Sequence, residues 1–219
     1  MSRSASRQSV FDFGPEAAQA LLRRKTEWRR AHPNSVFLAA KPEPDAAAQG
    51  MEIVRALCGR RGILREGREE EHLHATIQPI GAYEALSYET RPCDVVAALC
   101  AGDMVEARAF RTEFDLLQSF KGERDRRGRP TWKIVLCCRN CAVWMPLVEQ
   151  IAVALQRAGF PATSPLGFEP HMTLVYRGWQ IPTEVLERPV AWTVRSFLLV
   201  NSIYGRTTHE HLGQWQLRD

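Results

Sequence analysis

The same short pattern occurs twice in this chain and constrains its fold more than any other feature. His74-Ala75-Thr76 and His171-Met172-Thr173 are each followed by an aliphatic residue within an apolar run. Successive side chains of a β-strand point to opposite faces, so the imidazole and the hydroxyl of each motif lie on the same face. Each motif is therefore expected to present one imidazole and one hydroxyl to the same side of a sheet.

The segments before the two motifs repeat the same order of expected elements. Residues 36–40 form an apolar run typical of a strand, and residues 44–59 begin with Pro and then carry apolar residues at helical spacing. The same order recurs in residues 134–136 and 144–159, where the final glycine is expected to cap the helix. The pattern predicts two copies of a strand, a helix and a His-x-Thr strand.

The spacing within the two copies nearly agrees. Phe37 lies 37 positions before His74, and Val135 lies 36 positions before His171. We interpret this agreement as a diverged internal duplication, which would place the two motifs about a pseudo-twofold axis. The sequence therefore predicts an α+β fold of two pseudosymmetric lobes. Each lobe would be an antiparallel-rich sheet with a covering helix, and both motifs would lie on the floor of a central cleft.

These residues resemble the two-histidine (2H) phosphoesterases, and more narrowly the bacterial 2'-5' RNA ligase / RNA 2',3'-cyclic phosphodiesterase family. The resemblance is carried by residues 73–77 with Gly81, and by residues 168–174. It spans about residues 35–217. Three further segments support it: 36–40, 197–202 and 212–217.

The resemblance implies an enzyme that hydrolyses a 2',3'-cyclic phosphate end to a 2'-phosphate, with 2'-5' RNA ligation as a related activity. It implies that His171 is the base toward water and His74 the acid toward the leaving 3'-oxygen. The ordinary pKa of histidine, about 6.5, allows one ring to be neutral while the other is protonated, so no metal or other cofactor is expected. Thr76 and Thr173 are expected to hydrogen-bond the non-bridging phosphate oxygens.

The chain departs from the family after each motif, and this affects the expected substrate contacts. The family often has an aromatic residue after the first motif and an Arg five places after the second histidine. Here Pro79 and Tyr176 occupy those positions, and Arg177 follows one place later. We expect Tyr176 and Arg177 to contact the substrate.

A basic segment offers a second expected contact with substrate. Residues 121–130 form a polar connection between two strand candidates, and the arginines in question are Arg124, Arg126, Arg127 and Arg129. Charged connections are usually solvated hairpin loops. The functional alternative is an electrostatic guide for RNA phosphates, because Lys and Arg supply most sequence-independent affinity for nucleic acid. Both interpretations remain open.

The N-terminal segment falls outside the resemblance. Residues 1–14 are expected to be a disordered tail, residues 15–33 a helical extension, and residues 34–219 the two-lobed domain. The first residues lack the apolar region of a secretory signal, and Asp12 and Glu16 argue against a transit peptide. The extension is expected to pack on the domain edge, with an RNA-contacting basic arm as the alternative.

Composition limits the remaining function classes. The chain has 219 residues, 45% of them hydrophobic, which is enough for a substantial core. No apolar run approaches the roughly 18 residues of a membrane span. A net charge of only +4 argues against a strongly basic nucleic-acid coat protein. We expect a cytoplasmic monomer whose partners are RNA ends or nucleotides with a 2',3'-cyclic phosphate.

Cysteine and histidine pairs suggest alternatives. Of the six cysteines, Cys138 and Cys141 form a lone Cys-x-x-Cys, so free, buried thiols in a reducing cytoplasm are expected instead of a zinc site. Two His-x-His pairs, at residues 72–74 and 209–211, would be the ligands of a metal-dependent phosphodiesterase. A noncatalytic RNA-end-binding module is the third hypothesis.

Overall fold

The computed structural model describes residues 34–62, 69–80, 92–124, 127–161, 165, 167–203 and 208–219. Residues 34–219 form one compact unit, which is described here. The tail expected at residues 1–14 and the helical extension expected at residues 15–33 lie outside the described residues.

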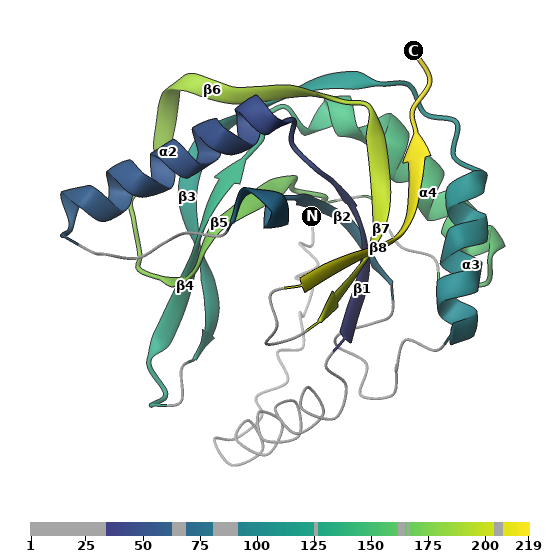
Figure 1. The fold of residues 1–219 in the computed structure, drawn as a ribbon, viewed down its shortest axis with the longest axis horizontal. Helices are drawn as coiled ribbons and strands as arrows, with labels where there is room; N and C mark the ends of the chain where they lie inside the picture. Colours follow the sequence, from purple (N-terminus) through teal and green to yellow (C-terminus); the bar gives the residue numbers. More distant parts are fainter. Residues whose placement is uncertain are drawn as a thin grey trace, which may run out of the picture. The chain divides into compact units, whose positions relative to one another are not determined.

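The described residues form one eight-stranded sheet in which all neighbouring strands are antiparallel (Figure 1). The order across the sheet is β6-β3-β4-β5-β2-β1-β7-β8. The strands are β1 (Asn34–Ala40), β2 (Ala75–Ile80), β3 (Phe110–Arg124), β4 (Pro130–Cys137), β5 (His171–Gly178), β6 (Glu184–Val194), β7 (Ser196–Ile203) and β8 (Thr208–Gln216). The predicted α+β class is confirmed, and the two lobes share a single sheet.

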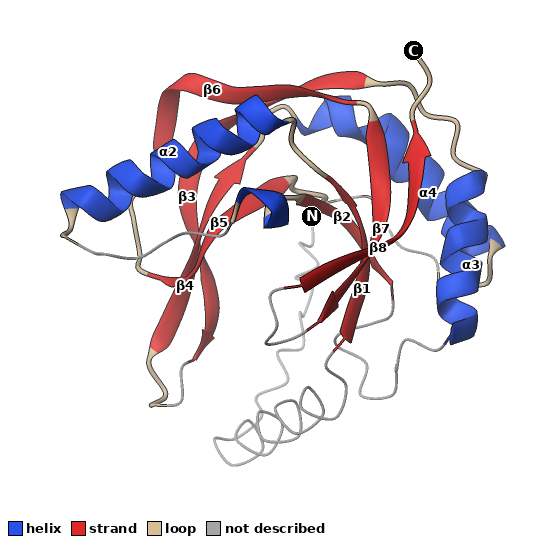
Figure 2. Cartoon of the chain, in the orientation of Figure 1, coloured by secondary structure: helices blue, strands red, loops and turns tan. Residues whose placement is uncertain are grey.

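Three α-helices accompany the sheet in the described part of the chain (labelled in Figure 2): α2 (Pro44–Arg60), α3 (Pro92–Asp103) and α4 (Met145–Arg157). Pro44 and Asp45 lie in the first turn of α2, where a missing N–H is tolerated and a negative charge is favourable. After α4, Gly159 adopts a φ of +93°, and the N–H of Phe160 donates to the carbonyl of Leu155. This is the Schellman geometry expected for a terminal glycine. None of the helices within the described ranges is long and apolar enough to cross a membrane.

The helices cover one face of the sheet and leave the other face to the motifs. Val54 of α2 and Ile151 of α4 belong to one buried cluster with the central residues of both motifs, Ala75 and Met172. Both central residues are fully buried, at 0% exposure. Because side chains alternate along a strand, the histidine and threonine of each motif point to the opposite face.

The two halves of the sheet are related by a pseudo-twofold axis between β2 and β5. Ala75 pairs with Met172, so the central residues of the two motifs lie directly opposite each other. Outward from this pair, β1 corresponds to β4, β7 to β3 and β8 to β6. The duplication inferred from the sequence therefore corresponds to two halves joined edge to edge, with the motif strands at the centre.

The register also corrects one equivalence proposed from the spacing. Ala39 pairs with Thr76, and Val135 pairs with Thr173. In each half the register shifts by one residue immediately beside that pair. Ala39, and not Phe37, is therefore the counterpart of Val135, because the two halves differ in the number of residues between strand and motif.

The connection expected over residues 121–130 is shorter than the sequence suggested. β3 continues to Arg124 and β4 already begins at Pro130, and the two strands pair as a hairpin with a register shift between Lys121 and Arg124. Charged residues are compatible with a strand when both of its faces are exposed, which explains why composition alone placed the strand end too early.

Candidate active site

The central strand pairing brings the four motif side chains together. His74 lies immediately before β2, and His171 is the first residue of β5. Continuing the register of the central antiparallel pair by one residue in each direction places His74 across from Thr173, and Thr76 across from His171. The two motifs thus contribute two imidazoles and two hydroxyls to one patch on the face away from the helices.

Both imidazoles are oriented by the same backbone contact. Nδ1 of His74 lies 2.8 Å from the carbonyl oxygen of His72, and Nδ1 of His171 lies 2.9 Å from the carbonyl oxygen of Glu169. A carbonyl only accepts hydrogen bonds, so Nδ1 carries the hydrogen in each ring and Nε2 is the acceptor of the neutral form. Each ring therefore uses Nε2 for any proton transfer with a ligand.

A phenyl ring supports each imidazole. Phe37 of β1 stacks on His74, with ring centroids 4.9 Å apart and planes inclined by 26°. Phe120 of β3 meets His171 at 66°, with centroids 5.1 Å apart. Contacts of this kind contribute about 0.5–1.5 kcal/mol beyond simple burial. Together with the carbonyl contacts they hold both rings in defined orientations.

The threonines differ in exposure. Thr173 is buried, at 8% exposure, whereas Thr76 is half-buried and lines a cavity. Their hydroxyls lie beside the imidazoles in the register described above and can donate to anionic oxygens. Two imidazoles and two hydroxyls on one face can remove a proton on one side of a phosphate, supply one on the other and stabilise the charge between.

A cavity of about 230 Å³ opens beside His74. Its lining comes mainly from the half of the sheet that carries the first motif: Ser35, Phe37, His74, Thr76, Pro79, Tyr176, Ser202 and His209. Of the substrate contacts expected from the sequence, Tyr176 is therefore in the cavity wall, where it is 41% exposed. Lys133 lies over its ring, 5.5 Å from the centroid.

The arginines expected to contact the substrate either lie away from the cavity or fall outside the described residues. Arg124 is exposed at the end of β3 and donates to the carbonyl of Gly128 at 2.6 Å. Arg127 and Arg129 are exposed in the same hairpin, and none of these three lines the cavity. Arg126 is outside the described residues, as is the side chain of Arg177, whose backbone belongs to β5.

The structure does not place both members of each His-x-His pair on one strand. His72 lies in a short 3-10 turn (Glu70–His72) before β2, so the alternation of a strand does not apply to it. Its ring instead contacts that of His209, with centroids 4.9 Å apart. His211 carries a lowered pKa, because of burial and the nearby charge of Lys41.

One set of possible metal ligands occurs within the described ranges. The ligand atoms of Glu69, Glu71 and His72 all lie within 4.8 Å of one another. Nδ1 of His72 is 3.3 Å from the Glu69 carboxylate, and Nε2 is 3.8 Å from that of Glu71. Both carboxylates are exposed, and such acidic groups surround a buried histidine as ion-pair partners without requiring a metal.

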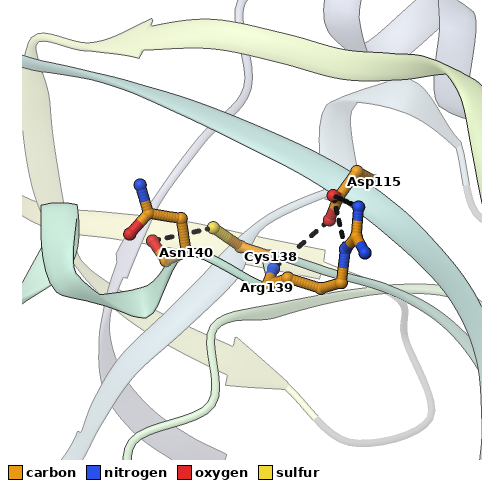
Figure 3. Close-up of polar contacts among 4 residues, drawn as sticks. All are labelled: Asp115, Cys138, Arg139 and Asn140. Atoms are coloured by element: carbon orange, nitrogen blue, oxygen red, sulfur yellow. Dashed lines mark hydrogen bonds and ion pairs between the residues drawn. The ribbon is translucent and has the colours of Figure 1, made fainter.

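Polar contacts with β3 anchor the loop after β4 (Figure 3). Asp115 accepts hydrogen bonds from the backbone N–H of Arg139 at 3.3 Å and from its Nε at 2.6 Å. Burial acts to raise the pKa of Asp115, but the contacts with Arg139 outweigh it and hold that pKa below its ordinary value. In the same loop, the Cys138 thiol donates to the carbonyl of Asn140 at 3.3 Å.

Two thiols near the second motif have raised pKa values. Cys137 pairs with His171 across β4 and β5, and burial raises the pKa of its thiol to about 12. Burial also raises the pKa of Cys141. All five cysteines with a described side chain are free, as expected, but Cys100 is exposed and Cys141 half-buried, so burial of every thiol was wrong. The raised pKa keeps the thiols of Cys137 and Cys141 protonated at neutral pH, so neither is a nucleophile there.

Comparison with known proteins identifies the fold. No family model matches the sequence, and no curated protein matches it significantly. Among solved structures, E. coli LigT in its apo form is 21% identical, with a TM-score of 0.56 over 86% of this chain and 99% of that chain. The protein TT0787 of Thermus thermophilus is 18% identical, with a TM-score of 0.59 over 84% of this chain and 98% of that chain.

A third structure, described only as a phosphoesterase, is 19% identical, with a TM-score of 0.57 over 85% of this chain and 100% of that chain. E. coli LigT has also been crystallised with 3'-AMP, phosphate, NADP⁺ and ATP. The chain therefore has the same α+β fold as these structures. The particular fold is that of E. coli LigT, which confirms the sequence resemblance at the level of fold.

Proposed function

We propose that this protein is an RNA 2',3'-cyclic phosphodiesterase that opens a cyclic phosphate end to a 2'-phosphate without a metal. The observation that carries the proposal is the matched pair of histidines. Nδ1 of His74 and Nδ1 of His171 each contact a carbonyl two residues upstream, so Nε2 is the nitrogen of each ring that would exchange a proton. The LigT fold and the nucleotides bound to E. coli LigT support a nucleotide substrate.

The proposed reaction uses each histidine once. Nε2 of neutral His171 accepts a proton from water as the water oxygen attacks phosphorus. The bond from phosphorus to the 3'-oxygen breaks, and Nε2–H of protonated His74 delivers its proton to that oxygen. Thr76 and Thr173 donate hydrogen bonds to the non-bridging oxygens, where negative charge increases. In 2'-5' ligation a 5'-hydroxyl replaces water: His171 accepts its proton as the hydroxyl oxygen attacks phosphorus, and His74 again protonates the leaving 3'-oxygen. Cleavage of the 2'-5' linkage is the reverse of this step and exchanges the two roles.

The expected partners are RNA ends or nucleotides with a 2',3'-cyclic phosphate, bound by a cytoplasmic monomer. Tyr176 supports this proposal through its place in the cavity wall. Arg177, which follows it on β5, remains a proposed contact. The free cysteines fit a reducing compartment, where thiols persist without pairing.

The decisive experiment is product analysis with an oligonucleotide that ends in a 2',3'-cyclic phosphate, in the presence and absence of EDTA. The expected product is the 2'-phosphate, formed equally in both conditions with a bell-shaped pH profile. A 3'-phosphate would reverse the leaving group. Loss on chelation with rescue by zinc or manganese would favour a metal-dependent phosphodiesterase. Binding without opening of the ring would favour a noncatalytic module.

The hairpin arginines are proposed to guide the RNA backbone, and a second experiment tests this role. Changing Arg124, Arg126, Arg127 and Arg129 together to Ser should weaken binding of an oligonucleotide and flatten its salt dependence, because fewer counterions are released. Hydrolysis of a cyclic mononucleotide should be unchanged, since it has no flanking phosphates. An equal loss of kcat/KM on both substrates, or no loss on either, would contradict the guiding role.

A further inference from the structure

The cavity breaks the symmetry of the site. The two motifs are related by the pseudo-twofold axis, yet the cavity is lined by His74 and Thr76 and by neither His171 nor Thr173. Its other walls come from β1, β7 and β8, with Tyr176 of β5 as the contribution from across the axis. A ligand that fills this cavity therefore lies on the His74 side of the phosphate site.

The lining has the two kinds of surface that a nucleoside requires. Tyr176 is exposed in the cavity wall and provides a ring on which a base can stack, and the half-buried ring of His209 lies in the same wall. Ser35 and Ser202 provide hydroxyls that can hydrogen-bond the sugar. The volume of about 230 Å³ is below the 300–1,000 Å³ usual for drug-sized ligands, which favours a single nucleoside as the occupant.

His209 is the cavity residue that lies next to the chemistry. It pairs with Ser202 across β7 and β8, and its side chain is half-buried. Its ring centroid is 5.2 Å from that of His74 and 6.0 Å from that of Phe37, and it meets both rings at steep angles. A side chain this close to the proposed acid is also close to the sugar whose oxygen that acid protonates.

We propose that the nucleoside bearing the cyclic phosphate occupies this cavity, and that His209 is a substrate-binding residue that hydrogen-bonds its ribose. The proposal rests on the cyclic phosphodiesterase function. It adds a direction to that function, because a ribose held beside His74 leaves the side of His171 open to water. It also makes recognition of the terminal nucleoside independent of the RNA that precedes it.

The test compares two substrates that differ only in the nucleoside. Adenosine 2',3'-cyclic phosphate carries it, and glycerol 1,2-cyclic phosphate has the same five-membered ring without it. His209→Ala should reduce kcat/KM for the adenosine substrate by about tenfold, mainly through KM, as expected for loss of one hydrogen bond in a desolvated site. It should leave glycerol cyclic phosphate nearly unaffected. His209→Gln, which retains a hydrogen-bonding group, should recover part of the loss.

His211→Ala is the matched control, because His211 lies on the same strand and does not line the cavity. It should change neither substrate. An equal loss on both substrates in His209→Ala would overturn the proposal, since His209 would then act on His74 or on the fold. No loss on either substrate would overturn it as well.

Calorimetric binding of adenosine 2'-phosphate separates this proposal from the function on which it rests. If the wild-type protein hydrolyses neither cyclic substrate, the phosphodiesterase function fails. Binding of the nucleotide that weakens about tenfold in His209→Ala and is retained in His211→Ala would still support the nucleoside cavity. Equal binding by all three proteins, or no binding by the wild type, would overturn it.

Discussion

Replacing each histidine of the two motifs by an amide separates proton transfer from hydrogen bonding. In His171→Gln the new amide nitrogen reaches approximately the place of Nε2, and in His171→Asn it reaches approximately that of Nδ1. The same pair of changes applies to His74. Neither amide takes up or releases a proton near neutral pH, so each variant keeps one hydrogen bond of the imidazole and abolishes its acid–base role.

The expected losses follow from what each ring does and contacts. Removing a general acid or base lowers kcat by about 10²–10⁴-fold, which is about 3–5 kcal/mol in the barrier. The fold loses far less. At Nδ1 of His74 the carbonyl contact is 2.8 Å long and at His171 it is 2.9 Å, and each is worth about 0.5–1.5 kcal/mol. The phenyl contact of each ring adds a similar amount.

Each single variant should therefore lose at most about 3 kcal/mol of folding free energy, and the Asn variants less, because they retain the carbonyl contact. The assays are kcat and KM on an oligonucleotide with a cyclic phosphate end, with thermal melting of every variant as the control. His74→Gln/His171→Gln should be hardly slower than the worse single variant, since both transfers belong to one displacement. A single Gln variant within tenfold of the wild-type kcat, or fully additive losses, would refute the two-histidine mechanism.

Three further predictions concern the surroundings of the site. Thr76→Val and Thr173→Val should each lower kcat by about 10²–10³-fold with little change in stability, as measured by kinetics and melting, because each removes one donor to the phosphate. Iodoacetamide at pH 8 should label exposed Cys100 and spare Cys137, whose pKa of about 12 leaves almost no thiolate, as peptide mass spectrometry would show. The pKa of Asp115 is lower in the folded protein than the unfolded value of about 3.9, so the ionised carboxylate stabilises the fold above that pH. Asp115→Asn should therefore lower the free energy of unfolding by up to about 1 kcal/mol at pH 7, as measured by urea unfolding. The difference between the two proteins should disappear as the pH falls through the folded pKa.

Local periodicity predicted the elements that carry the motifs. The helix expected at residues 44–59 is observed at Pro44–Arg60, and the one expected up to Gly159 is observed at Met145–Arg157. These predictions succeeded because an amphipathic helix with proline at its start and glycine after its end is specified by residues near in sequence. The faces of the motifs followed in the same way from strand alternation.

Local periodicity could not predict contacts between strands that are distant in the sequence. His209 follows the second motif by 38 positions, and pairing of β8 with β7 and of β7 with β1 brings it to His74. The signal that singled it out, the spacing to His211, pointed to a metal site, whereas the structure places it in a cavity wall. His72, the other member of the first His-x-His pair, lies in a 3-10 turn before β2. Neither strand order nor such a turn leaves a periodic trace in the sequence.

The near symmetry of the site raises the question of how two equivalent histidines would take opposite roles in the proposed reaction. A single displacement requires one neutral and one protonated ring, yet both imidazoles have the same tautomer-setting contact and a phenyl neighbour. The difference must therefore come from what lies beyond those contacts. His74 adjoins a cavity and the ring of His209, and His171 pairs with Cys137, whose thiol stays neutral. A ligand held in the cavity would bind next to only one of the two rings. In the proposed reaction, substrate binding itself would therefore distinguish the acid from the base.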